Sequence, residues 1–201
     1  MRISFHGAAR MVTGSKHLLT LRSGTNILLD CGLFQGMGKD TQPLNESFGF
    51  EPKEIDMIIL SHAHIDHCGL LPRIVRKGFK GPIYSTPATK ELTGILLEDS
   101  AEIQRDDTRF INKRRAKQGL PPFEPLYDLA DAAKAIELFE TKEYDQWHQL
   151  SPEVSVMFTD AGHIIGSAAV HLAITEDGKI TKQLNAARIR CATDLLHLAP
   201  A

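Results

Sequence analysis

Three histidines and one aspartate fall within six consecutive positions of this sequence: His62, His64, Asp66 and His67. Imidazole nitrogens and carboxylate oxygens at this density suit zinc or a similar first-row divalent ion. His62 and His64 are two residues apart, so in extended backbone their side chains point to the same side. The alternative is a polar loop of unrelated histidines, but the spacing favours a metal site.

The segments on either side of this cluster indicate how it is held. Residues 55–60 form a short apolar run rich in β-branched residues, which is typical of a buried strand. The chain must turn after this strand. Apolar spacing over residues 69–78 then predicts a helix that ends at Gly78, since Pro72 is tolerated in a first helical turn.

A further histidine, His163, follows a glycine at the end of a predicted strand over residues 153–158. An imidazole at a strand end, remote from the first cluster, is what a distant third nitrogen ligand should look like, although the signal is weak when taken alone. Gly162 and Gly166 would let this loop bend close to an ion.

Asp30 ends the second strand of a hairpin that we predict over residues 16–21 and 26–30. A half-buried carboxylate without hydrogen bonds is costly, so Asp30 needs polar partners. The alternative is a plain turn residue.

The other predicted elements are strands at 2–6 and 82–86, a surface loop at 33–54, helices at 87–118 and 128–139, and a hairpin at 169–174 and 179–182. The second half of the long helix is basic. We interpret it as a solvated face in preference to an RNA contact.

The composition is that of an ordinary soluble protein. With 201 residues the chain can form one sizeable core, and its net charge of −2 gives no electrostatic argument for nucleic acid. It has no apolar run long enough to span a membrane, and its N-terminus shows no signal peptide. The three cysteines are far apart, which favours a reducing, cytoplasmic setting over a disulfide framework.

The pattern His-x-His-x-Asp-His after a hydrophobic strand resembles the signature of the metallo-β-lactamase-fold hydrolases. Other stretches resemble the β-CASP branch of RNA-processing nucleases: residues 7–15, 29–32, 96–104 and 125–139. The resemblance implies an α/β fold, a metallo-β-lactamase-like αββα sandwich of which this chain holds roughly the N-terminal half. We expect a mostly antiparallel sheet with helices on one face. Residues 1–182 would form the N-terminal part of the catalytic lobe, and 183–201 an atypical tail.

The resemblance also implies roles for individual residues. His62, His64 and His163 would hold a first zinc ion. Asp66 and His67 would hold a second, with Asp66 also catalytic because it helps to orient water. Asp30 would support the metal-binding loop. Two zinc ions are expected from the family, and the first should be retained more readily here.

The last residues depart from the family pattern. A Gly-Asp that bridges the two metals is expected there, whereas Asp194 lacks the preceding glycine. A later histidine ligand and the lobe that closes over RNA are also missing. We therefore expect weak or no nuclease activity from this chain. One uncovered sheet face would lead to homo-oligomerisation or dependence on a missing C-terminal segment.

Three functions remain open on these grounds. The first is a zinc-dependent phosphodiesterase acting on single-stranded RNA, incomplete in this chain. The second is a metallo-hydrolase of a small ester, thioester or lactam, because the same ligands serve many substrates. The third is a non-catalytic zinc-binding fragment. No membrane partner is expected.

Overall fold

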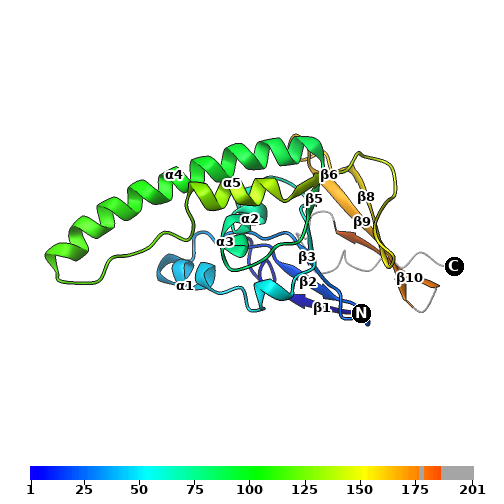
Figure 1. The fold of residues 1–201 in the computed structure, drawn as a ribbon, viewed down its shortest axis with the longest axis horizontal. Helices are drawn as coiled ribbons and strands as arrows, with labels where there is room; N and C mark the ends of the chain where they lie inside the picture. The colour runs from blue at the N-terminus through cyan, green and yellow to red at the C-terminus, as the bar shows by residue number, and fades with distance from the viewer. Residues whose placement is uncertain (177–178, 187–201) are drawn as a thin grey trace.

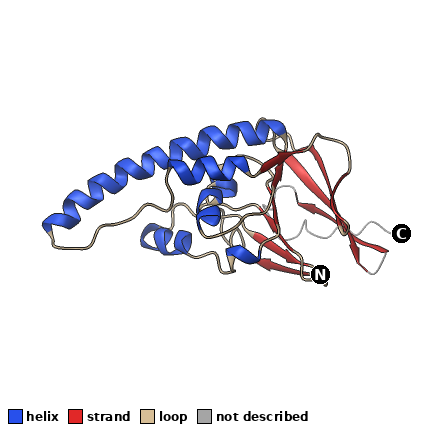
Figure 2. Ribbon diagram, in the orientation of Figure 1, coloured by secondary structure: helices blue, strands red, loops and turns tan. Residues whose placement is uncertain are grey.

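The fold is built from two β-sheets that lie against one another, with helices on the outer face of the first (Figures 1 and 2). It is seen in a computed structural model, which describes residues 1–176 and 179–186. The first sheet has six strands, in the order β1-β2-β3-β4-β5-β6. Their bounds are β1 Arg2–Phe5, β2 His17–Thr20, β3 Asn26–Leu29, β4 Met57–Ile59, β5 Ile83–Ser85 and β6 Phe139–Thr141.

The pairing within this sheet is mixed. β2 and β3 form the predicted hairpin, with His17 opposite Leu29. From β3 to β6 each neighbouring pair is parallel, so the expectation of a mostly antiparallel sheet under the helices is wrong. The physical reason is the connections, because parallel neighbours need a crossover and helical segments supply it at each step.

The helices occupy these crossovers. They are η1 Gly38–Asp40, α1 Thr41–Glu46 and η2 Pro52–Glu54 before β4; α2 Ile65–Cys68 and α3 Leu71–Arg76 before β5; and α4 Pro87–Lys117 and α5 Leu129–Glu137 before β6. The long helix α4 confirms the prediction for residues 87–118, and α3 and α5 lie within the predicted helices. None of the helices in the described residues is long and apolar enough to cross a membrane.

The second sheet is antiparallel, in the order β10-β9-β8-β7. Its strands are β7 His148–Ser151, β8 Val154–Asp160, β9 Ala168–Glu176 and β10 Lys179–Ala186. β10 is longer than predicted, so the start of the tail expected at residue 183 continues this strand as far as Ala186. Asp194 lies outside the described residues.

Two apolar cores result, one on each face of the first sheet. Neighbouring residues of a strand point to opposite faces, so Ile58 packs under the helices with Leu71 and Leu97. Ile59 instead packs between the sheets with Phe158 and other inward residues of β8 and β9. The expectation that this sheet lacks a cover is therefore wrong, because the chain itself supplies the second sheet.

The segment expected as a surface loop at 33–54 is more ordered than predicted. Besides its short helices it buries Phe34 and Phe48. The side chain of Asn45 accepts from the backbone N–H of Phe34 at 2.7 Å and donates to its carbonyl at 3.0 Å. These two bonds satisfy the backbone polar groups of Phe34 in the interior, which polarity alone does not reveal.

Candidate metal centre

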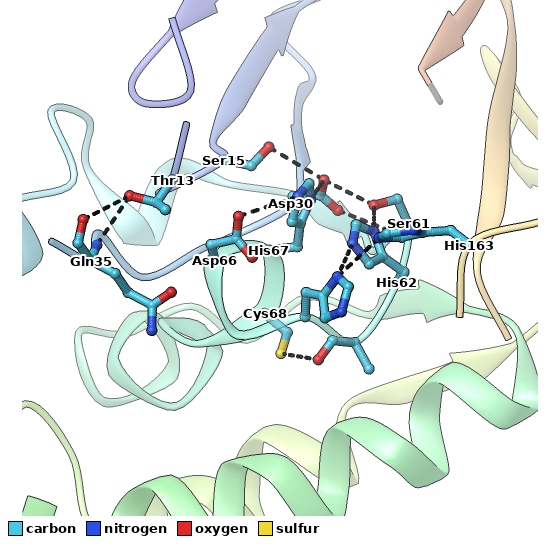
Figure 3. Close-up of polar contacts among 12 residues, drawn as sticks. Thr13, Ser15, Asp30, Gln35, Ser61, His62, Asp66, His67, Cys68 and His163 are labelled. Carbon is cyan, nitrogen blue, oxygen red and sulfur yellow. Dashed lines mark hydrogen bonds and ion pairs between the residues drawn. The ribbon is translucent and has the colours of Figure 1, made fainter. Parts of the chain in front are cut away.

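The candidate residues gather at one edge of the first sheet. Asp30 follows β3, Ser61 and His62 follow β4, and Thr86 follows β5. These strands are parallel, so their carboxyl ends meet at the same edge, where loops of α/β sheets commonly form sites. Figure 3 shows His62, Asp66 and His67 converging there with His163, which lies in the loop between β8 and β9 of the second sheet.

Three imidazoles face one another in this cluster. Nδ1 of His64 lies 3.1 Å from Nε2 of His62 and 3.1 Å from Nε2 of His163. The three ligand atoms all lie within 4.8 Å of one another. One ring nitrogen cannot satisfy two others at once by hydrogen bonding, whereas a shared cation can bind all three. The donor set therefore fits a divalent first-row ion, for which imidazole is a preferred ligand.

The loop between β8 and β9 carries His163 into place. The N–H of Ala168 donates to the carbonyl of Ser61 at 2.9 Å, which joins the second sheet to the edge of the first. The hydroxyls of Thr86 and Thr89 both donate to the carbonyl of Gly166 at 2.7 Å. Gly166 has φ +81°, and a Cβ there would lie 2.5 Å from the backbone nitrogen of Thr89. A side chain at residue 166 would therefore push this loop, and His163 with it, away from the first sheet.

Ser61 determines which nitrogen of His62 is available. Its hydroxyl lies 3.0 Å from Oδ2 of Asp30 and 2.9 Å from Nδ1 of His62. A hydroxyl has a single proton, so when it donates to the carboxylate it accepts from Nδ1–H of His62. The lone pair of His62 is then on Nε2, which faces His64 and is free to bind a metal.

Asp66 and His67 form a second pair beside the three imidazoles. Nδ1 of His67 lies 2.7 Å from Oδ2 of Asp30, and its Nε2 lies 3.8 Å from Oδ2 of Asp66. The rings of His62 and His67 have centroids 4.0 Å apart, so the two groups adjoin. A histidine that donates one nitrogen to a carboxylate presents the other to a metal. Within the described residues this second group offers two side chains, one carboxylate and one imidazole, of the kinds that bind a metal.

The backbone around Asp66 and His67 is held from two sides. The carbonyl of Asp66 accepts from the N–H of Ser15 at 2.8 Å, and the carbonyl of His67 accepts from the N–H of Cys31 at 2.7 Å. Gly32 lies directly against this turn, since a Cβ there would fall 1.6 Å from the carbonyl oxygen of Asp66. Only glycine allows this approach.

Burial and charge set the protonation of this group. Burial acts to raise the pKa of Asp30, but the neighbouring His67 outweighs it and holds the pKa below its usual range. Burial, with His67 nearby, lowers the pKa of His62 to about 3, which keeps that ring neutral as ligation requires. Burial also acts to lower the pKa of His67, but Asp30 overrides it and raises the pKa.

Several supporting residues were not assigned roles from the sequence. Ser61 bridges Asp30 and His62, while Thr86 and Thr89 hold the loop that carries His163. Thr86 also caps α4, with its hydroxyl accepting from the N–H of Thr89 at 3.3 Å. A threonine followed by Pro87 at a predicted helix start is the signal that identifies the cap, but its second contact is between distant segments.

Comparison with known proteins gives consistent matches. Residues 17–167 match the metallo-β-lactamase superfamily. The chain is 42% identical over 170 residues to Ribonuclease TTHA0252 of Thermus thermophilus, covering 85% of this chain and 34% of that protein. It is 31% identical over 176 residues to transcription termination factor FttA of Methanocaldococcus jannaschii, covering 88% and 25% respectively. The chain thus spans about a third or less of these relatives.

Solved structures agree on the fold. A motif mutant of a metallo-β-lactamase from Cronobacter sakazakii superposes with a TM-score of 0.53 and 20% sequence identity, covering 92% of this chain and 58% of that one. At this identity the similarity concerns the fold alone. The α/β, metallo-β-lactamase-like fold predicted from the sequence is therefore confirmed, as is the resemblance to RNA-processing relatives.

Proposed function

The chain belongs to the metallo-β-lactamase superfamily, and from this premise we propose that it is the metal-binding part of a zinc-dependent phosphodiesterase of the β-CASP type that cuts single-stranded RNA. The observation that supports this most strongly is the convergence of His62, His64 and His163, whose ligand atoms lie within 4.8 Å of one another. The relative with 42% identity is named a ribonuclease, which favours RNA over small substrates.

In this proposal His62, His64 and His163 hold one zinc ion, and Asp66 and His67 contribute to a second. A bound zinc ion supplies Lewis-acid activation of water and neutralises charge that develops on the phosphate. Residues of the chain itself orient the ligands and the attacking water. Asp30 and Ser61 orient the rings of His67 and His62. Asp66, whose carboxylate lies 3.8 Å from Nε2 of His67, would accept a hydrogen bond from the attacking water and align it.

The other candidate functions share the same ligands. A hydrolase of a small ester, thioester or lactam would use the same three imidazoles, and a non-catalytic zinc-binding domain would need no more than they provide. Neither is favoured by the named relatives.

The buried thiols of Cys31 and Cys68 are free, which suits a reducing compartment, and we place the protein in the cytoplasm.

The test combines metal content with substrate choice. Elemental analysis of the purified chain should find zinc, with the His64→Ala variant depleted of it. The zinc-loaded chain is then offered labelled single-stranded RNA, a chromogenic lactam and a thioester. We expect RNA cleavage to be slow at most and to be abolished by a chelator and by His64→Ala, without turnover of the small substrates. Faster hydrolysis of the lactam or thioester than of RNA would overturn the proposal.

A further inference from the structure

The distal end of α4 differs from the rest of the molecule in charge. Residues 109–120, which we call the basic tip, carry five of the chain's 23 lysines and arginines and none of its 25 acidic residues. Figure 1 shows this end of α4 projecting beyond the rest of the fold, with the following segment running back beside it. The whole chain is nevertheless slightly acidic, at −2, so the positive charge is concentrated locally.

The basic residues of α4 differ in whether a carboxylate accompanies them. Near the middle of the helix, Arg105 is paired with Glu102 and Asp106. Arg109 at the boundary still reaches Asp106, at 3.9 Å. Further along, no carboxylate of the described residues lies within 4.0 Å of Lys113, Arg114 or Lys117, all of which are exposed. The helix dipole favours positive charge in the last turn only, so it does not account for Lys113.

An exposed aromatic ring accompanies these charges. Phe110 keeps 64% of its surface exposed. It precedes Lys113, Arg114 and Lys117 by three, four and seven residues, a spacing that places all four side chains on one helical face. Cations beside an accessible aromatic ring are the combination that binds single-stranded nucleic acid, since bases stack on the ring while the cations hold phosphates.

A groove lies beside α4, and its lining includes neither the four side chains of this face nor the candidate metal ligands. It encloses about 620 Å³ between α4 and the segments at 33–45 and 123–126. Ile65, next to His64, lines one part of it, and Thr108 and Ile111 line the part beside the tip. From Leu96 to Lys113 the helix rises about 25 Å. Asp99 and Asp107 also line the groove, whereas none of its lining residues is a lysine or arginine, so the groove itself offers no phosphate-binding side chain.

From these observations we propose, in place of the solvated face expected from the sequence, that the basic tip is an anchoring surface for single-stranded RNA, remote from the metal centre, which holds one part of a strand while another part reaches the metal ligands. The proposal rests on the proposed function, because it takes RNA as the substrate. It assigns phosphate binding to Lys113, Arg114 and Lys117 and base stacking to Phe110.

The test compares two triple variants of equal charge. K113E/R114E/K117E reverses the tip, and K53E/K77E/K80E reverses three exposed lysines on other elements. Binding of a fluorescent RNA of about 20 nucleotides is measured at several salt concentrations. We expect the tip variant to bind about 10-fold or more weakly and its salt slope to fall by about two, as loss of three phosphate contacts predicts. The control variant should retain most of the affinity and slope.

Two further measurements separate this proposal from the function it rests on. Phe110→Ala should weaken RNA binding about 5-fold or more without changing the salt slope. Hydrolysis of bis(p-nitrophenyl) phosphate, which is too small to reach the tip, should be the same in the tip variant and the unmodified protein. Absence of bound zinc, or faster hydrolysis of a lactam or thioester than of RNA, would overturn the proposed function, while the binding comparison still tests the tip. Equal RNA affinity in the two triple variants would overturn the anchoring surface. Binding to anionic vesicles is measured alongside, and a tip variant that lost binding to vesicles but kept its binding to RNA would overturn it as well.

Discussion

Nδ1 of His67 lies 2.7 Å from Oδ2 of Asp30, and the other oxygen of the same carboxylate accepts from the backbone N–H of Ser61 at 2.8 Å. Asp30 has φ +59° and is buried, so its position between these two groups is set by the loop after β3. One carboxylate thus orients both Ser61, which precedes the first candidate ligand, and His67, which is the last candidate ligand of the same loop. A non-glycine residue at positive φ in a buried site costs stability, which its hydrogen bonds offset.

Asp30→Asn tests this role. The amide keeps the shape but presents a donor where Asp30 accepts hydrogen bonds, so His67 and Ser61 lose their common partner. We expect zinc affinity to fall about 10–100-fold and the free energy of unfolding to fall by about 1–3 kcal/mol. Competition with a chromogenic chelator and urea denaturation measure the two effects. Asp56→Asn is the matched control, because Asp56 lies before β4 and accepts from the N–H of Asn26 at 2.7 Å. Equal losses in both variants would argue against the role of Asp30.

His163→Ala removes the imidazole that the loop between β8 and β9 brings to the candidate metal site. Its loss should reduce zinc affinity by more than loss of a supporting residue does, hence by more than about 100-fold. The far-UV spectrum should stay unchanged because the ring is exposed. His148→Ala, whose ring contacts the carbonyl of Glu143 at 3.0 Å, is the control. Zinc binding by His163→Ala that matches the unmodified chain would contradict a ligand role for this residue.

Gly166→Ala and Gly162→Ala form a matched pair in the loop that carries His163. Both glycines have positive φ, so alanine at either costs about 1–2 kcal/mol of backbone strain. A Cβ at residue 162 meets nothing within 4 Å, whereas one at 166 would lie 2.5 Å from the nitrogen of Thr89. We therefore expect both variants to lose stability but Gly166→Ala to lose more zinc affinity. Thermal unfolding measures the loss of stability, and zinc titration measures the loss of zinc affinity. A greater loss of zinc affinity in Gly162→Ala than in Gly166→Ala would show that the contacts of Gly166 with Thr86 and Thr89 do not position His163.

The buried side chain of Lys16 leads us to expect that the free energy of unfolding depends on pH. Its side chain is fully buried, donates to the carbonyl of Gly32 at 3.0 Å and lies 3.9 Å from the ring centroid of Phe34. Burial lowers the pKa of Lys16 from 10.5 to about 8. Between these two values the unfolded chain binds more protons than the folded one, so the free energy of unfolding should rise with pH across this range. The full rise is about 3 kcal/mol.

The check is urea denaturation at several pH values between 8 and 10.5, with Lys16→Met as the comparison. Other groups titrate in the same range, so the informative quantity is the difference between the two proteins. The free energy of unfolding of the unmodified chain, minus that of the Lys16→Met variant, should increase steadily as the pH rises. A difference that does not depend on pH would show that Lys16 keeps its ordinary pKa in the folded state.

Much of the site could be predicted because its signals are local. His62, His64, Asp66 and His67 are adjacent in sequence and follow an apolar run whose residues Met57–Ile59 form the buried strand β4. The hairpin of β2 and β3 and the helix α4 were predicted from periodicity and turn residues for the same reason. The surface loop at 33–54 was misjudged because the burial of Phe34 and Phe48, and the two hydrogen bonds between Asn45 and Phe34, depend on how this segment folds against the core.

The amino-acid sequence by itself determined which ligand types are present, that they follow strands, and that Asp30 needs partners, since all three follow from side-chain chemistry and short-range periodicity. Only the tertiary structure decided that the ring of His163 meets those of His62 and His64, and that the second sheet covers the first. Both depend on contacts between residues far apart in the chain, such as Ala168 with Ser61 and Gly166 with Thr89. Such contacts form only when loops close and cores pack, so local sequence patterns do not specify them.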